Sequence, residues 1–288
     1  MMAFFYDDDW DVITIKKLKK LDMNIFMAKH LGAECIGLAI YDDQLREALG
    51  LGKPLKTIEE RMKIMEQIRG VDFVFIVSSL QKDIVKESAE KAYKIYEQNK
   101  KLENEKKQVE KKKYEYGYVP GTYDLFHIGH LENLLEALEH CKKIIVGVKS
   151  DSLVEKHKNR KPVTSANERM EILRRFKFVD IVHEYDVRDP QVAVNQIKEK
   201  YGIDVNVIIL GSDLKEDFSN VNIEGVDKKF TYRDKEKMET ISTTAYMEIH
   251  SENEKNKRRK CIINKNIIHC KRTNKNNGDM KGTDIDER

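Results

Sequence analysis

The chain has 288 residues, enough for two domains of ordinary size. Charged residues make up 36% of it, yet the net charge is +3, which indicates folded parts together with solvated helices or tails. No apolar run approaches the length that spans a bilayer, which argues against an integral membrane segment. The start, MMAFFYDDDWDV, is acidic, whereas a signal peptide begins with basic residues.

The cysteines stand at positions 35, 141, 261 and 270 and show no CxxC spacing. Cys35 and Cys141 lie in apolar surroundings, so we expect them to be reduced thiols in the core. The sequence therefore predicts a cytoplasmic protein without a metal site of its own.

The two halves of the chain repeat one another at a shift of 108 residues. CIGLAIYDDQL (35–45) falls within CKKIIVGVKSDSL (141–153), with Ile36 on Ile144 and Asp43 on Asp151, and the segment 53–77 lies over 161–185. In the second pair the dipeptide Lys-Pro, the triplet Glu-Arg-Met and the dipeptide Val-Asp stay in register. This agreement predicts two duplicated versions of one fold.

The same shift places unrelated residues opposite the polar loop that begins the second half. His127 falls on Lys19, and His130 falls on Asp22. The other positions in this register are Gly121 on Ile13, Asp124 on Lys16 and Gly129 on Leu21. Because the scaffold persists while the loop is rewritten, we expect the first half to be a degenerate copy without catalytic residues.

Composition suggests four parts. They are a degenerate domain (1–80), a charged helical linker (81–116), a catalytic domain (117–250) and a disordered basic tail (251–288). The linker begins with apolar residues at helical spacing and becomes almost wholly charged from Asn99 to Lys113. The tail is rich in Lys and Asn and lacks interleaved aromatic residues, so it does not predict a nucleic-acid partner.

Strand and helix patterns alternate along the second half. Strands are expected at 116–120, 144–150, 179–185 and 205–213, and helices at 129–141, 167–176 and 190–201. This βαβαβα order predicts an α/β fold with a doubly wound, mostly parallel, Rossmann-like sheet. Ligands of such folds bind at the carboxyl ends of the strands, where the loop 121–128 lies.

That loop carries GTYDLFHIGH (121–130), which puts two imidazoles at the mouth of a helix. A helix N-terminus attracts phosphate through its backbone N–H groups and partial positive charge. His127 and His130 are about one turn apart, so both can face the same anion. Gly121 and Gly129 permit a close approach of the backbone. The pattern indicates a phosphate site that favours charge developing during in-line displacement.

Residues 117–250 resemble the cytidylyltransferase branch of the HxGH nucleotidyltransferase superfamily. The matching segments are GTYDLFHIGH (121–130), KHKNRKP (156–162), ERMEIL (168–173), FVD (178–180), GSD (211–213) and ISTT (241–244). Together they are most similar to glycerol-3-phosphate cytidylyltransferases, while the choline- and ethanolamine-phosphate enzymes share most of them. One departure is KMET (237–240), which stands where the family usually has Arg-Thr-x-Gly.

The resemblance implies roles for individual residues. His127 and His130 would contact the CTP phosphates, while Lys158 and Arg160 would neutralise the triphosphate and the incoming phosphate. The remaining nucleotide-site residues would be Gly121, Thr122, Asp124, Gly129, Arg169, Asp213, Ser242 and Thr243. A structural role stays open for Arg169, because Arg61 matches it in the degenerate copy, and Asp213 could instead cap a helix.

The resulting hypothesis is a CTP-dependent transfer of CMP, with Mg²⁺ accompanying the nucleotide, to a small phosphorylated alcohol, glycerol 3-phosphate being favoured. Choline phosphate and ethanolamine phosphate remain alternative acceptors. An adenylyltransferase of the same superfamily and a non-catalytic nucleotide-binding scaffold remain alternative functions. The resemblance also implies a possible homodimer.

Overall fold

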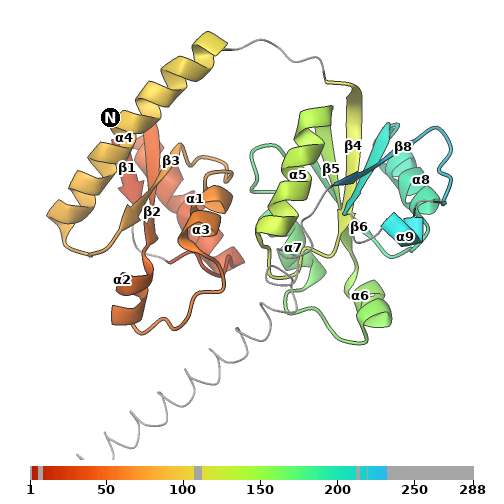
Figure 1. The fold of residues 1–288 in the computed structure, drawn as a ribbon, viewed down its shortest axis with the longest axis horizontal. Helices are drawn as coiled ribbons and strands as arrows, with labels where there is room; N and C mark the ends of the chain where they lie inside the picture. The colour runs from red at the N-terminus through yellow and green to blue at the C-terminus, as the bar shows by residue number, and fades with distance from the viewer. Residues whose placement is uncertain (1, 6–8, 107–111, 212–214, 219, 232–288) are drawn as a thin grey trace, which may run out of the picture. The chain divides into compact units, whose positions relative to one another are not determined.

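The structure is a computed structural model that describes residues 2–5, 9–106, 112–211, 215–218 and 220–231. Contacts group Met1–Tyr246 into one compact unit and Met247–Arg288 into another. Because the described residues end at 231, the predicted tail lies outside them, and the boundaries proposed for the four parts stay predictions. Strands and helices alternate along the described chain (Figure 1).

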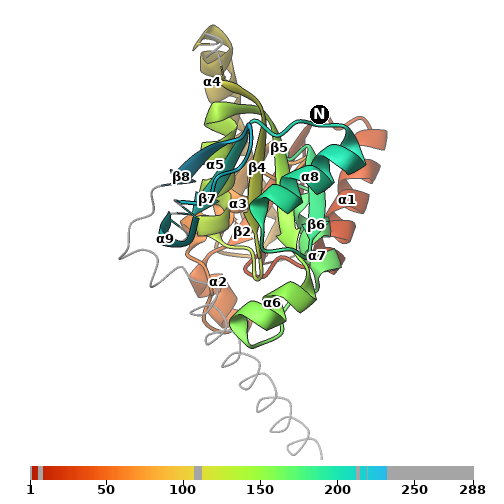
Figure 2. The ribbon, with the colours of Figure 1, turned by 90° about the vertical axis from the view of Figure 1, so that its right-hand side faces the viewer.

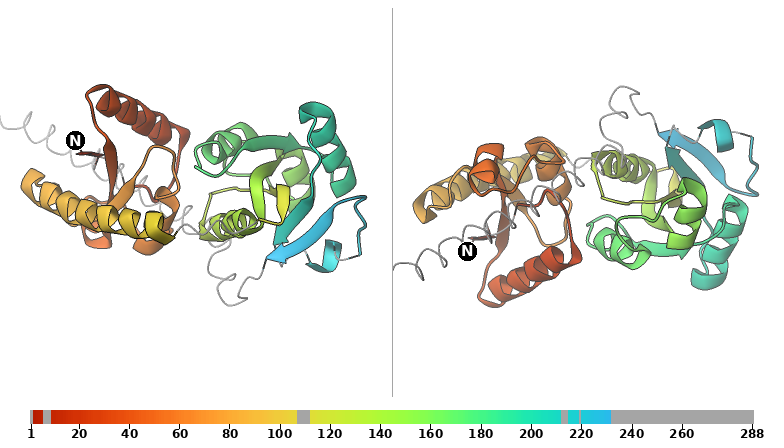
Figure 3. Two further views of the ribbon diagram at one scale, coloured as in Figure 1. Left: turned by 90° about the horizontal axis from the view of Figure 1, so that it is seen from above. Right: turned by 90° about the horizontal axis from the view of Figure 1, so that it is seen from below.

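The first half is built on parallel strands in the order β1-β2-β3. The strands are β1 (Met2–Phe5), β2 (Cys35–Tyr41) and β3 (Phe73–Val77), and the helices are α1 (Ile15–His30), α2 (Asp43–Ala48), α3 (Ile58–Met65) and α4 (Lys82–Lys106). Helices α1 and α3 cover one face of the sheet, and α4 covers the other (Figure 3). Val85 and Ala89 of α4 are fully buried, so this helix, expected as linker, belongs to the core of the first half.

The second half is a parallel sheet in the order β6-β5-β4-β7-β8. Its strands are β4 (Tyr114–Gly121), β5 (Cys141–Lys149), β6 (Ile181–Tyr185), β7 (Val207–Gly211) and β8 (Asp227–Thr231). Its helices are α5 (Ile128–His140), α6 (Asp151–Lys158), α7 (Ala166–Leu173), α8 (Pro190–Tyr201) and α9 (Lys215–Phe218). Apolar residues of α5 and α7 pack on one face and those of α8 on the other, which confirms the expected α/β fold (Figure 3).

The repeat is confirmed over its central part, because the same polar contacts recur at the shift of 108. Thr57 and Glu60 form a capping box at the start of α3, and Ser165 and Glu168 form one at the start of α7. The carboxylate of Asp72 accepts from Ile36 N–H at 2.8 Å. Its counterpart Asp180 accepts from Ile144 N–H, also at 2.8 Å.

The gapless register expected for the polar loop is wrong. Asp11 accepts from the N–H groups of Leu55 and Lys56 at 3.0 and 3.1 Å. Asp124 accepts at 3.0–3.1 Å from the N–H groups of residues 163 and 164, which match 55 and 56 at the shift of 108. Asp124 therefore corresponds to Asp11, at a shift of 113. A longer α1, with 16 residues against 13 in α5, helps to absorb the difference.

No helix among the described residues is long and apolar enough to cross a membrane. Cys35 and Cys141 are buried and unbridged, as expected. Burial raises the pKa of both thiols to about 11, which keeps them protonated and unreactive at neutral pH.

Candidate active site

The polar loop lies at the carboxyl edge of the second sheet, where β4 ends at Gly121 and α5 begins at Ile128. This position is next to the point where the strand order reverses around β4, the usual ligand site of doubly wound sheets. A Cβ atom on Gly121 would lie 2.7 Å from the ring of Tyr123, so a larger residue would displace the ring. The glycine thus lets the chain turn sharply out of the strand.

The two imidazoles come together at the start of α5. Their ring centroids are 3.7 Å apart with an interplanar angle of 23°. His127 is the N-cap residue and 3% exposed, and its backbone N–H donates to Nδ1 of His130 at 3.4 Å. Since Nδ1 of His130 accepts, the ring proton of His130 is assigned to Nε2.

Backbone strain shapes the loop between the strand and the imidazoles. Tyr123 and Leu125 adopt positive φ angles of +59° and +47°, a region that L-residues rarely occupy. The hydroxyl of Tyr123 donates to Val119 O at 3.0 Å. Between these two residues, buried Asp124 accepts from the backbone of Val163 and Thr164 and from the Thr164 hydroxyl at 2.9 Å. The side chain therefore ties the loop to the start of α7, and its predicted role in the nucleotide site stays a prediction.

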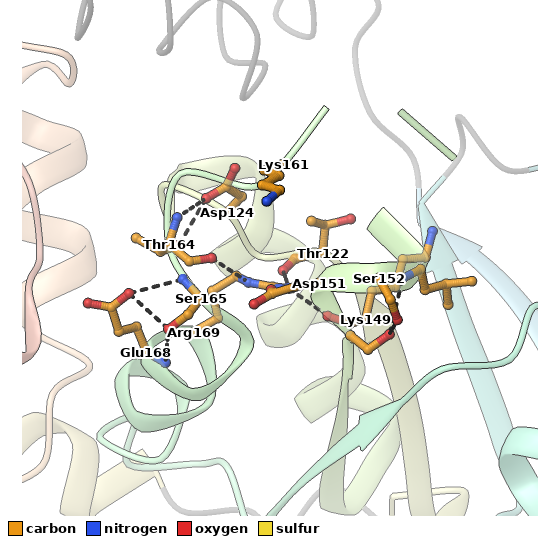
Figure 4. Close-up of polar contacts among 12 residues, drawn as sticks. Thr122, Asp124, Lys149, Asp151, Ser152, Lys161, Thr164, Ser165, Glu168 and Arg169 are labelled. Carbon is orange, nitrogen blue, oxygen red and sulfur yellow. Dashed lines mark hydrogen bonds and ion pairs between the residues drawn. The ribbon is translucent and has the colours of Figure 1, made fainter. Parts of the chain in front are cut away.

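Arg169 is 1% exposed and joins three segments that end at the same edge of the sheet (Figure 4). Its Nε donates to Thr164 O at 3.0 Å. One terminal nitrogen donates to Thr122 O at 2.6 Å and to Lys149 O at 2.8 Å. The other terminal nitrogen pairs with the carboxylate of Asp151. These contacts show that Arg169 fixes the loop to the end of β5 and to the start of α7. Its predicted contact with the nucleotide stays a prediction.

Basic residues lie at the same edge of the sheet as the loop. Lys158 ends α6 and is exposed, and Figure 2 shows this helix beyond the carboxyl end of β5. Arg160 is half-buried and pairs with Asp124 at 3.6 Å. Lys149 ends β5 at the same edge, and Lys161 lies beside Asp124 in Figure 4. Arg160 is thus held next to the loop by Asp124, and the predicted contact of Lys158 and Arg160 with phosphates stays a prediction.

Some expected site residues are not placed. Asp213, Ser242, Thr243 and the segment 237–240 lie outside the described residues. Among the described residues there is no cluster of His, Cys, Asp and Glu able to hold a metal ion. The carboxylate of Asp124 is engaged by N–H and O–H donors, so its surroundings suit loop fixation better than metal ligation.

Asp151 and Thr164 were not predicted from the sequence, although both hold the loops of the site. The repeat carried the signal for Asp151, because Asp43 matches it and pairs with Arg61 at 2.5 Å. An aspartate and an arginine kept in both copies predict an ion pair that the fold itself requires. Thr164 has Lys56 as its counterpart, so the repeat gave no signal for it.

The first copy fills the same place with an ion cluster. At the corrected shift of 113, Thr14 replaces His127 as the helix N-cap and Lys17 replaces His130. Lys17 pairs with Asp9 at 2.6 Å, and buried Arg46 pairs with both Asp9 and Asp11. This copy thus lacks both imidazoles, as expected. Where the second copy has its histidine pair, the first has aspartates paired with lysine and arginine side chains.

Comparisons with known proteins concern the second half of the chain. The family model described as Cytidylyltransferase-like matches residues 118–253. FAD synthase of Thermococcus sibiricus is 32% identical over 122 residues, which cover 39% of this chain and 79% of that protein. FAD synthase of Pyrococcus abyssi is 35% identical over 96 residues, 33% of this chain and 61% of that protein. The bifunctional protein HldE of Rhodopseudomonas palustris is 32% identical over 98 residues, 34% of this chain and 19% of that protein.

A crystal structure of the lipopolysaccharide core biosynthesis protein from Thermoplasma volcanium GSS1 overlaps with 42% of this chain and 98% of that chain. The sequence identity is 20% and the TM-score is 0.34. A score this low adds nothing to the strand order, which establishes the α/β fold without it.

Proposed function

The chain belongs to the cytidylyltransferase-like family of nucleotidyltransferases, and we propose that it transfers CMP from CTP to a small phosphorylated alcohol, with release of pyrophosphate. Glycerol 3-phosphate is the favoured acceptor, and choline phosphate and ethanolamine phosphate are the alternatives. The single observation that carries the proposal is the stacked pair His127 and His130 at the N-terminus of α5. Nucleotide selection rests on the resemblance of GTYDLFHIGH and its companion segments to cytidylyltransferases.

In this proposal the protein orients the two substrates and stabilises the negative charge on their phosphates. The phosphate of the alcohol is the nucleophile, so no activated side chain is needed. The imidazoles and the N-terminus of α5 stabilise the charge that grows on the α-phosphate as pyrophosphate leaves. Lys158 and Arg160 lower the repulsion between the two phosphorylated substrates. Asp124 and Arg169 hold the loop in place, so that these donors are already oriented when the substrates bind.

Mg²⁺ is expected to enter with the nucleotide. Magnesium in nucleotide sites is commonly held by substrate phosphates with few protein ligands. When bound, the ion would neutralise charge on the phosphates.

The test is pyrophosphate release by the purified chain, measured separately with CTP and with ATP and with a panel of phospho-alcohols. The proposal predicts release with CTP that depends on one phospho-alcohol. Release from ATP with none from CTP would refute the choice of nucleotide. The panel also identifies the acceptor, which the described residues do not select.

A second candidate is adenylyl transfer, because the relatives in Thermococcus sibiricus and Pyrococcus abyssi are named FAD synthase. FAD contains an adenylyl group, so the same site geometry would serve ATP and a phosphorylated acceptor. FMN is therefore added to the acceptor panel in the ATP arm. A third candidate, a nucleotide-binding scaffold, predicts no turnover with either nucleotide and no difference between the wild type and His130→Asn.

A further inference from the structure

A contact between the two copies follows a local two-fold axis. Ile68 and Phe176 are equivalent at the shift of 108, and they form an antiparallel bridge with one another. Helix α1 contacts α7, and α3 contacts α5. Since α5 is the counterpart of α1 and α7 that of α3, these are the same contact made twice. Two copies of one fold meeting in this way have the arrangement of a two-fold dimer, here within one chain.

The backbone at the axis obeys the same symmetry. Arg69 N–H donates to Arg175 O at 2.7 Å, and Lys177 N–H donates to Gln67 O at 2.9 Å. Residue 69 matches 177 and residue 67 matches 175, so each hydrogen bond is the image of the other. The two segments therefore form a short ladder whose register is fixed by backbone groups.

The side chains depart from this symmetry at one matched pair. Nε of Arg69, in the first copy, donates to Phe176 O at 3.1 Å, and its terminal nitrogen donates to Val179 O at 2.6 Å. Its counterpart Lys177 sends Nζ in the opposite direction, to Glu66 O at 2.6 Å. The planar guanidinium thus clamps the Phe176–Val179 turn of the second copy, whereas the lysine holds a carbonyl of the first.

A short chain of aromatic rings leads from this turn to the imidazoles. The ring of Phe176 is fully buried and lies 4.7 Å from the ring of Phe126, centroid to centroid. Phe126 directly precedes His127, and its ring lies 5.6 Å from that of His130. Both phenylalanines are closely packed, so a shift of the turn displaces Phe126 and then the histidine pair.

We propose that Arg69 of the degenerate copy is a positioning residue for the reaction in the second copy. It fixes the turn that carries Phe176, and through Phe126 it fixes His127 and His130. The degenerate copy then takes the place that a second subunit has in a two-fold dimer. It lacks the imidazoles but provides Arg69, which holds the turn of the second copy. The effect on turnover rests on the proposed function, whereas the effect on the imidazoles does not.

The experiment compares the full chain with Arg69→Ala and with Lys177→Ala as the matched control. Each variant removes one cationic side chain from the same contact, but only the first releases carbonyls of the second copy. We expect Arg69→Ala to lower kcat about tenfold with the KM for nucleotide within twofold, because small displacements of catalytic groups act on the transition state. Lys177→Ala should keep kcat within twofold. Arg69→Lys should recover part of the loss.

The second readout is the NMR signal of the His130 ring, assigned with His130→Asn, in the absence of nucleotide. Arg69→Ala should shift this signal, which the ring of Phe126 influences, and Lys177→Ala should not. Unchanged ring signals in Arg69→Ala would overturn the inference, as would equal effects of the two alanine variants on kcat. If Arg69→Ala fails to fold, Arg69→Lys is judged by the same signals. A wild type that turns over no nucleotide refutes the proposed function, while the ring signals still decide this inference.

Discussion

At the scale of single residues, the histidine pair differs from the polar residues around it. Asp124 and Arg169 are buried, bonded to backbone groups, and matched by Asp11 and Arg61 in the degenerate copy. Because the degenerate copy retains this aspartate and this arginine without the imidazoles, their role in holding the fold is enough to explain them. His127 and His130 have no imidazole counterpart in that copy, so the proposed function assigns the chemistry to them.

The first prediction is that His130→Asn lowers pyrophosphate release about 10²–10³-fold, the usual effect of removing one donor that stabilises developing charge. The unfolding free energy should change little, because an Asn oxygen can still accept from the His127 N–H. Rates at saturating nucleotide and urea unfolding measure the two effects. The control His30→Asn changes an exposed histidine of α1 and should leave the rate unaltered. Equal rates in His130→Asn and the wild type would remove the basis of the proposal.

The second prediction concerns His183 on β6, whose side chain is 5% exposed and lies edge-on to Tyr201. Burial, followed by repulsion from Lys200, lowers the pKa of this imidazole. The unfolded chain, with an ordinary pKa of about 6.5, takes up the proton first as the pH falls. The unfolding free energy should therefore decrease as the pH drops below about 6.5. Urea unfolding at pH 7.5 and 5.5 should show a smaller decrease for His183→Phe, and an equal decrease in both proteins would contradict this assignment.

At the scale of elements, the loops at the carboxyl edge are held by a side chain from α7. The guanidinium of Arg169 donates to the carbonyl of Thr122, which follows β4, and to that of Lys149, the last residue of β5. Arg61 makes the corresponding bond to Tyr41 O, at the end of β2, at 2.6 Å. Both copies thus use an arginine to fix the strand ends against a helix. The same device supports a histidine site in one copy and an ion cluster in the other.

The third prediction separates these roles. Arg169→Met and Arg61→Met should each cost about 3 kcal/mol of unfolding free energy, because buried carbonyls lose charged donors. Arg169→Met should also lower the turnover of the folded fraction, since Thr122 O lies in the loop before the histidines. Arg61→Met is the matched control and should leave turnover per folded molecule unchanged. Urea denaturation measures the unfolding free energy of each variant. Turnover is measured separately, at a temperature where both variants are folded.

Strong local signals explain which elements could be predicted. The apolar β-branched run at 144–150 and the pattern of 190–201, which ends at Gly202, gave strands and helices within a few residues of β5 and α8. Helix α6 was missed because DSLVEKHK is short and polar and buries Leu153 and Val154 alone. Strand β8 (DKKFT) was missed because an edge strand needs few apolar residues. The true register of the loop was hidden by an insertion near α1, which a gapless comparison cannot show.

At the scale of the molecule, the apolar core continues from one copy into the other. Ile64, Met65 and Ile68 of the first copy belong to the same buried cluster as Leu173 and Phe176 of the second. The sequence predicted the duplication but not this continuity, because contacts between copies leave no periodic pattern. A homodimer remains a prediction, and the face around Ile68 and Phe176 is already occupied within the chain.

The fourth prediction is that both copies unfold together. Trp10 is the single tryptophan of the chain, is 3% exposed and belongs to the first copy, so its fluorescence reports that copy. Far-UV circular dichroism reports both. The two signals should give the same urea midpoint in the wild type. An earlier midpoint for Trp10 would show that the first copy unfolds independently and would contradict a shared core.

The central claim is that the paired imidazoles of α5 bind the nucleotide's phosphates. A crystal structure of the chain with CTP and Mg²⁺, or with ATP in a parallel crystal, tests it most directly. The account predicts phosphate oxygens within hydrogen-bonding distance of His127 or His130. Nucleotide phosphates bound at any other place, including the ion cluster of the first copy, would contradict it.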